Sequence, residues 1–178
     1  KETKETETST EEVKNEIAQF TPEIEENAVI YELNIRQYSP EGTFNAFAKH
    51  LDRLKAMGVQ TIWFMPINPI SKLDRKGSLE SYYAVSDYTA VNPEFGTMDD
   101  FKKLVEAIHH KGMKVLIDWV PNHTGADHRW ITQHPDFFVN DSSGKPAVAF
   151  DWNDTRQFNY QNQVMQDSML NAMKYWIE

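Results

Sequence analysis

The stretch "VLIDWVPNHTG", residues 115–125, places one carboxylate, Asp118, inside an apolar run and follows it with an abrupt polar loop. Burying a charged group is costly unless the group is paired, hydrogen-bonded or protonated. We therefore read Asp118, near the end of a buried strand, in two ways. It holds a loop or an arginine in place, or it belongs to a functional site at the mouth of the strand. The two roles are compatible.

Three apolar runs, at residues 29–38, 61–66 and 113–120, are predicted to be strands. Short apolar runs rich in β-branched and aromatic residues are typical of strands buried on both faces of a parallel sheet. The large aromatic side chains in these runs are expected in the core: Trp63, Phe64 and Trp119.

Helical patterns alternate with these strands. Residues 44–58 and 97–112 predict helices, and the second begins with a capping box formed by Thr97 and Asp100. The apolar face of each recurs at helical spacing: Phe44, Phe47, Leu51 and Leu54, then Phe101, Leu104, Val105 and Ile108. A third helix is expected over 162–177, with an apolar stripe that we assign to core packing.

Alternation of strands and helices, with apolar strands, predicts βα units around a parallel sheet. In such folds, chemistry takes place on the loops at the carboxyl ends of the strands. Two long irregular segments, 67–96 and 121–160, follow the second and third strands. Loops of this length within a compact domain are usually functional, so we expect the site on these two segments.

Composition excludes several classes of protein. The chain has 178 residues and no cysteine, which rules out a disulfide scaffold, a thiol nucleophile and a cysteine-ligated metal. Its net charge is −9, and residues 1–27, with three Lys and nine Glu, carry most of it. We predict that this segment is a disordered acidic tail or linker, and we expect no nucleic-acid partner. No apolar run approaches the roughly 20 residues that span a bilayer, so no transmembrane segment is expected.

Polar residues follow Asp118 in the loop. Asn122 has a carbonyl oxygen suited to calcium, and His123 can donate a hydrogen bond to a substrate hydroxyl. His123 and His128 could also suggest zinc, but a convincing third ligand is missing. Residues 122–124 match an N-glycosylation acceptor, for which the mouth of a strand is a poor position.

Residues 81–97, "SYYAVSDYTAVNPEFGT", mix aromatic and polar side chains. This mixture suits sugar rings, whose C–H faces stack on tyrosine and whose hydroxyls need fixed donors and acceptors. The alternative is a loop held down by its own aromatic residues. The sequence contains neither a phosphate-binding glycine loop nor a serine nucleophile elbow.

Three segments in this order, "GVQTIWFMPI" (58–67), "YAVSDYTAVNPEFGTMDDF" (83–101) and "DWVPNH" (118–123), resemble the alpha-amylase family, glycoside hydrolase family 13. The resemblance extends over about residues 29–178. It implies an α/β fold, namely the N-terminal portion of a (β/α)8 TIM barrel. This portion would hold strands one to three, helices one to three and an irregular insertion after strand three.

The resemblance also implies domain boundaries. After the tail, a first half-barrel would occupy residues 28–123. An inserted domain B would occupy 124–160, and the third barrel helix would occupy 161–178.

The family's pattern assigns roles by position. Asp118 would support a catalytic arginine and a nucleophile on the next strand. Tyr83 would stack under the sugar at the point of cleavage, and His123 would hydrogen-bond that sugar. Asn122 would ligate a structural calcium in calcium-binding members. Gln157 stands where many members have Asp, and an amide binds calcium more weakly than a carboxylate, which weakens the expected calcium site.

The family's nucleophile and acid/base lie on later strands, so we expect the sequence to be truncated. A retaining glycosidase needs two carboxylates about 5 Å apart, so the chain alone is expected to be inactive. The whole enzyme would cleave α-1,4-glucosidic bonds of starch or maltooligosaccharides. The alternatives are a transglycosylase or isomerase of the trehalose synthase or branching enzyme type, and a non-catalytic module such as a transporter heavy chain. We favour an exported location over the cytoplasm, with a possible lipid anchor upstream of the acidic tail.

Overall fold

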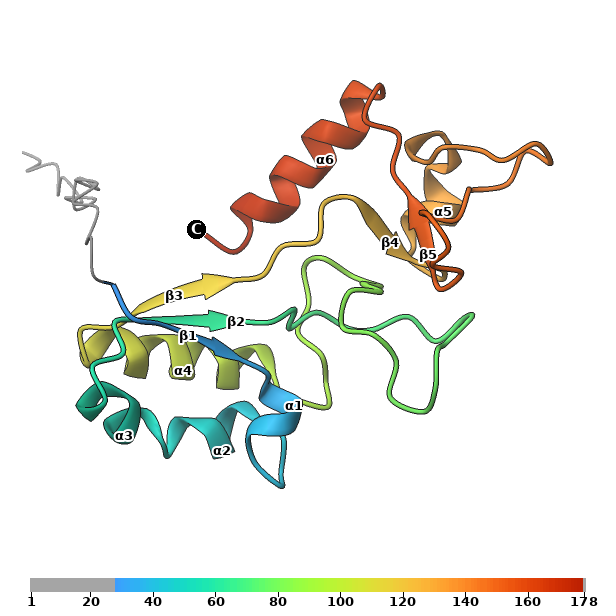
Figure 1. The fold of residues 1–178 in the computed structure, drawn as a ribbon. Helices are drawn as coiled ribbons and strands as arrows, with labels where there is room; N and C mark the ends of the chain where they lie inside the picture. Colours follow the sequence, from blue (N-terminus) through green and yellow to red (C-terminus); the bar gives the residue numbers. More distant parts are fainter. Residues whose placement is uncertain (1–27, 178) are drawn as a thin grey trace, which may run out of the picture.

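The computed structural model describes residues 28–177 (Figure 1). The predicted tail, residues 1–27, lies outside this range. Among the described residues, no helix has the length and apolar character needed to cross a membrane.

The predicted parallel sheet is confirmed. Its three strands are β1 (Ile30–Leu33), β2 (Thr61–Phe64) and β3 (Lys114–Ile117), in the order β1-β2-β3 with both pairings parallel. The sheet is open, so the described part of the chain forms no closed barrel. All three strands are shorter than predicted. Residues 35–38, predicted as part of the first strand, form the short helix α1 (Ile35–Tyr38), which turns the chain away from the sheet and buries Ile35 in the core.

The predicted helix over 44–58 is two helices, α2 (Phe44–Ala48) and α3 (Leu51–Ala56). The interruption lies where the Tyr38 ring packs edge-on against Phe47 and His50. The predicted buried face is nevertheless correct. Each of its four side chains is at most 1% exposed: Phe44, Phe47, Leu51 and Leu54.

The second predicted helix is α4 (Met98–His110), and its capping box is confirmed. The Thr97 hydroxyl accepts a hydrogen bond from the Asp100 amide, and the Asp100 carboxylate accepts one from the Thr97 amide. Such caps satisfy amides that the first helical turn leaves unpaired. The start of α4, next to the long loop 67–96, is therefore fixed.

Helices α2, α3 and α4 cover one face of the sheet (Figure 1). Because successive side chains of a strand point to opposite faces, Ile62 and Phe64 lie in the core. Trp63 lies on the other face, in register with Glu32 of β1 and Leu116 of β3, and all three side chains are exposed. The prediction that Trp63 is a core residue is wrong, since it is 37% exposed.

The strand β3 is also less buried than predicted. Its residues alternate between exposed and partly buried, because β3 is an edge of the described sheet. Trp119, predicted within this strand, follows its end and packs partly against a second apolar cluster. Asp118 therefore lies just beyond the end of a strand that is only partly buried.

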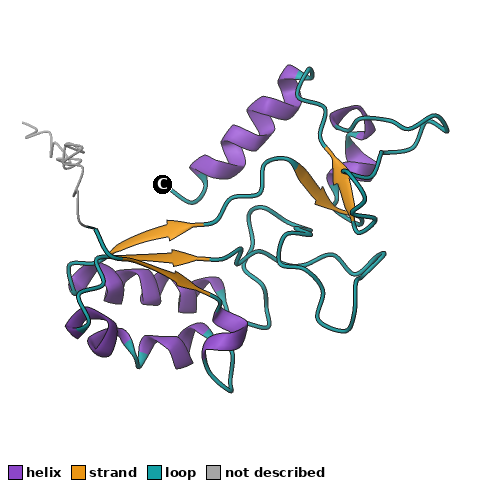
Figure 2. Cartoon of the chain, in the orientation of Figure 1, coloured by secondary structure: helices purple, strands orange, loops and turns teal. Residues whose placement is uncertain are grey.

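The segment after β3 forms a two-stranded antiparallel ribbon, β4 (His123–Gly125) with β5 (Thr155–Gln157). Between them lie α5 (Trp130–Gln133) and η1 (Pro135–Phe137), and α6 (Gln163–Lys174) follows. The second apolar cluster joins this segment to α6 through Phe138, Phe158 and Met165, among others. Figure 2 shows that the long loop after β2 reaches the same region as β4 and β5.

Candidate functional site

The structure brings Tyr83 and Asp118 together at the carboxyl ends of the strands. The Tyr83 hydroxyl donates a hydrogen bond to Asp118 Oδ2 at 3.2 Å, although 35 positions separate the two residues. Tyr83 comes from the loop after β2, and Asp118 follows β3 directly. The Asp118 amide donates to the Phe64 carbonyl at 2.8 Å, so the backbone of Asp118 continues the sheet by one hydrogen bond.

Electrostatics keep the proton on Tyr83 in this pair. Partial burial raises the pKa of Asp118, the Tyr83 hydrogen bond opposes that shift, and the Glu32 carboxylate adds to it. Burial also raises the pKa of Tyr83, and the Asp118 charge adds to that shift. Tyr83 is thus a neutral donor at neutral pH, and Asp118 retains acceptor capacity for another partner. Glu32 was not singled out in the sequence, because its effect depends on the pairing of β1 with β2.

His123 is the first residue of β4 and is 6% exposed. Its Nδ1 lies 3.1 Å from Asn122 Nδ2, and its Nε2 has no hydrogen-bond partner among the described residues. Burial is the largest effect on the pKa of His123, and it lowers this pKa below the usual value. His123 is therefore neutral at neutral pH. With Asn122 donating to Nδ1, Nε2 carries the hydrogen and can donate it to a ligand.

Tyr83 and His123 line one pocket of about 360 Å³. This volume falls within the range of about 300–1,000 Å³ that is common for ligand sites. The other side chains around the pocket are Lys76, Ser81, Trp152, Asp154 and Thr155. Trp152 and the Lys76–Asp154 ion pair, whose Nζ and Oδ1 are 3.0 Å apart, were missed by sequence reasoning. The only sequence signal was a polar and aromatic "DWNDT" near the end of the second long segment.

A buried tyrosine fixes the loop between β3 and His123. The Tyr88 hydroxyl lies 2.7 Å from the Val120 carbonyl and 2.8 Å from the His123 carbonyl. Burial raises the pKa of Tyr88 well above its usual value, so the hydroxyl keeps its hydrogen. For Tyr88, the alternative of a loop held by its own aromatic residues is correct. Tyr83, 38% exposed beside the pocket, is a different case.

Gly125 allows the two loops of the site to cross closely. Its amide donates to the Val85 carbonyl at 2.7 Å. A Cβ at this position would lie 2.3 Å from Ser71 Cβ and 2.7 Å from the Ala84 carbonyl oxygen. Only glycine fits here without a shift of the loop that holds Tyr83.

The residues predicted for calcium do not fit that ion. A pocket of about 670 Å³ beside Asn122 and Gln157 is lined by amides and aromatic or apolar side chains, without a carboxylate. Calcium sites in proteins rely on carboxylate oxygens. Across residues 28–177, no group of three or more His, Cys, Asp or Glu side chains is placed to hold a metal.

His128 is a structural residue in this arrangement. It is 2% exposed, its Nδ1 accepts a hydrogen bond from the Trp130 amide, and its ring packs against Tyr88 and Trp130. Burial lowers the pKa of His128 to about 4, so it is neutral at pH 7.

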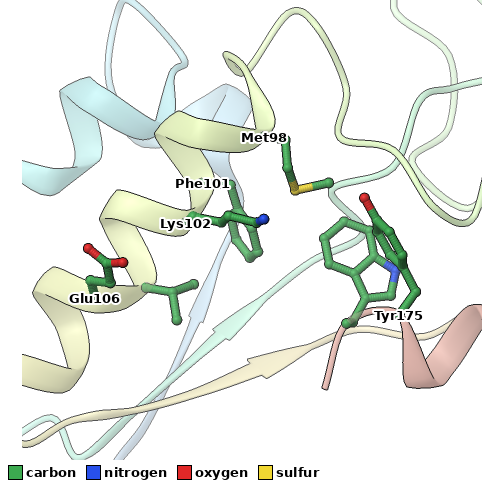
Figure 3. Close-up of a pocket in the computed structure, with 7 residues that line it drawn as sticks. Met98, Phe101, Lys102, Glu106 and Tyr175 are labelled. Carbon is green, nitrogen blue, oxygen red and sulfur yellow. The ribbon is translucent and has the colours of Figure 1, made fainter. Parts of the chain in front are cut away.

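A second hollow lies outside the strand mouth. It has a volume of about 480 Å³ and lies between α4 and the residues that follow α6 (Figure 3). Met98, Phe101 and Tyr175 provide much of its lining, and its charged side chains are Lys102 and Glu106 on α4. This hollow lacks the convergent polar groups expected of a catalytic site.

Comparison with known proteins shows the family of the chain. The family model described as the alpha amylase catalytic domain matches residues 4–156. The chain belongs to the alpha-amylase family. A crystal structure of an alpha-amylase from Lactobacillus plantarum, 39% identical, superposes with a TM-score of 0.82 over 84% of this chain and 36% of that protein. The structural neighbours of this alpha-amylase family chain are TIM-barrel amylases, which confirms the predicted fold class.

Two curated relatives are named for activities other than that of an alpha-amylase. An alpha-glucosidase from Apis mellifera is 29% identical over 86% of this chain and 33% of its own length. A trehalose synthase from Pimelobacter is 30% identical over 88% of this chain and 33% of its own length. The alpha-amylase family chain thus spans about a third of the relatives that it matches.

Proposed function

We propose that the chain forms part of the sugar-binding wall of a glycoside hydrolase that cleaves α-1,4-glucosidic bonds in starch or maltooligosaccharides. One observation carries the proposal. Tyr83, from the loop after β2, and His123, from β4, line the same pocket, and Asp118 is hydrogen-bonded to Tyr83. Membership in the alpha-amylase family supports the reaction class.

Each of the three residues has a distinct role in this proposal. The Tyr83 ring stacks on the sugar, and the neutral His123 donates from Nε2 to a sugar hydroxyl. Asp118 fixes Tyr83 and offers its remaining acceptor capacity to a cationic partner. We assign Asp118 a supporting role and not that of the nucleophile, because the family's pattern places the nucleophile on the next strand of the barrel. We assign the nucleophile and the acid/base to parts of the enzyme outside this chain.

The test compares two preparations on a chromogenic maltooligosaccharide. The full-length protein is expected to release the chromophore, and residues 1–178 alone are expected to show no release above buffer. A full-length protein without activity on any α-glucan would contradict the proposed reaction. Activity of the 178-residue chain alone would contradict our assignment of the two catalytic carboxylates.

The similarity to a trehalose synthase supports a second candidate, transfer or isomerisation at the same site. Incubation with maltose separates the two reactions, because hydrolysis yields glucose alone and isomerisation yields another disaccharide. We favour hydrolysis, since the alpha-amylase from Lactobacillus plantarum is 39% identical to this chain and the trehalose synthase is 30% identical.

A further inference from the structure

Two exposed aromatic rings stand at the edge of the sugar pocket. Trp152 lines that pocket, and its ring centroid lies 5.4 Å from the ring of His123. The Phe150 ring lies 4.8 Å from Trp152. Trp152 is 41% exposed and Phe150 is 75% exposed, so both rings present apolar surface to solvent beside the pocket.

The backbone at Phe150 is unfavourable for a side chain of this size. Phe150 has a φ of +55°, within a tight turn in which the Trp152 amide donates to the Ala149 carbonyl at 3.0 Å. Glycine or asparagine adopts this conformation at lower cost. Since the ring is mostly exposed, burial compensates little of that cost. A bulky aromatic residue held in a strained turn beside a site suggests a role in binding.

The turn is anchored to the rest of the molecule. Ala149 at its base is fully buried, and the Thr155 amide and hydroxyl both donate to the Trp152 carbonyl. Asp154, two residues after Trp152, pairs with Lys76 from the loop that follows β2. The aromatic pair is therefore preorganised relative to Tyr83 and His123, which lowers the entropic cost of binding.

The chemistry around the pair suits a carbohydrate. Apolar ring faces lie next to the polar groups of Lys76, Ser81 and Asp154, which line the same pocket. Sugars need both kinds of contact, because their C–H faces are apolar and their edges carry hydroxyls.

We propose that Phe150 and Trp152 form an aromatic platform for a second glucose unit, adjacent to the unit held by Tyr83 and His123. This inference rests on the proposed function, and it adds a structural basis for preference among glucans of different length. The pocket alone would bind one sugar of an α-1,4-glucan. The platform extends recognition to the neighbouring sugar, so affinity should depend on the number of linked glucose units.

The experiment measures binding of maltose, maltotriose and maltopentaose to the full-length protein by titration calorimetry under conditions of slow turnover. The variants are Phe150→Gly, Trp152→Leu and the conservative Phe150→Tyr. We expect Phe150→Gly and Trp152→Leu to lose about five- to tenfold in affinity for maltopentaose, the order expected for loss of one aromatic stack. The increase in affinity with chain length should become smaller, and Phe150→Tyr should bind like the wild type.

Two controls separate the platform from a structural role. Val148→Ala removes an exposed apolar side chain of the same segment that does not line the pocket, and it should leave all three affinities unchanged. Phe150→Gly relieves an unfavourable φ, so its melting temperature should not fall.

The outcomes distinguish the two proposals. A wild-type protein that binds the glucans, with unchanged affinities in Phe150→Gly and Trp152→Leu, would refute the platform and leave the proposed function standing. The same loss for all three sugars, without dependence on chain length, would also refute it. A wild-type protein that binds none of the sugars would refute both proposals.

Discussion

Replacement of Gly125 by alanine tests whether the close crossing of the two loops positions the site. The new Cβ would lie 2.3 Å from Ser71 Cβ, whereas carbon atoms in contact are about 3.5 Å apart or more. Ser71 or Gly125 must therefore move by about 1.2 Å. The Ala84 carbonyl, 2.7 Å from the same Cβ, belongs to backbone adjacent to Tyr83 and cannot rotate away as a side chain would.

The expected cost follows from overpacking. Insertion of a methyl group into a tight site destabilises proteins by about 1–3 kcal/mol, and the displacement of backbone on two segments places Gly125→Ala near the upper value. The melting temperature should fall accordingly. A displacement of about 1 Å near a reacting group can lower turnover about 100-fold, so kcat should fall more than stability alone would explain.

The assays are thermal unfolding and hydrolysis of a chromogenic maltooligosaccharide by the full-length protein. Gly144→Ala is the matched control, because a Cβ there meets nothing within 4 Å although φ is +78°. This control should lose about 1 kcal/mol through backbone strain and keep its turnover. If Gly125→Ala equals Gly144→Ala in both assays, the crossing does not position Tyr83.

Three further predictions concern charge, hydrogen bonding and metal. His128 has a folded-state pKa of about 4 against 6.5 when unfolded, so the unfolded chain binds the proton first. The contribution of His128 to the free energy of unfolding should therefore be fully present above about pH 6.5, and the free energy of unfolding should fall by about 3 kcal/mol as the pH decreases toward 4. Denaturant titration should show a smaller pH dependence in His128→Gln. Tyr83→Phe removes the hydrogen bond that lowers the pKa of Asp118. The value of kcat should therefore decrease about tenfold, and the acid limb of its pH profile should move to higher pH. An unchanged profile would show that ionisation of Asp118 does not affect catalysis. Removal of calcium by a chelator should leave melting temperature and turnover unchanged, since amides line the pocket at Asn122 and Gln157; a clear loss of either would show a calcium site that this donor set does not predict.

The features of the fold that depend on residues close in sequence were predictable. The buried faces of α2, α3 and α4 follow from helical spacing, and the capping box at Thr97 follows from a three-residue interval. The error at Trp63 has a different origin. A short apolar run does not reveal which of its two faces will be covered, because that depends on what packs against the sheet. The partly exposed β3 has the same cause.

The site was predictable to a similar degree. Tyr83, Asp118 and His123 were expected from their motifs, and the structure places Tyr83 against Asp118 and on one pocket with His123. Trp152 was missed because it reaches this pocket from the end of an irregular segment, through the pairing of β4 with β5. Such long-range pairing leaves no periodic signal in a single sequence.

The hydroxyl of Tyr88 bears on tolerance to alkaline conditions. It lies within hydrogen-bond distance of two carbonyls, of Val120 and His123, on either side of the polar loop. A surface phenol would lose its proton near pH 10, and its oxygen would then repel both carbonyls. Because burial raises the pKa of Tyr88 well above that value, its hydrogen bonding to the two carbonyls should persist at a pH at which exposed tyrosines are ionised. A loss of activity near pH 10 should therefore originate at a group other than Tyr88.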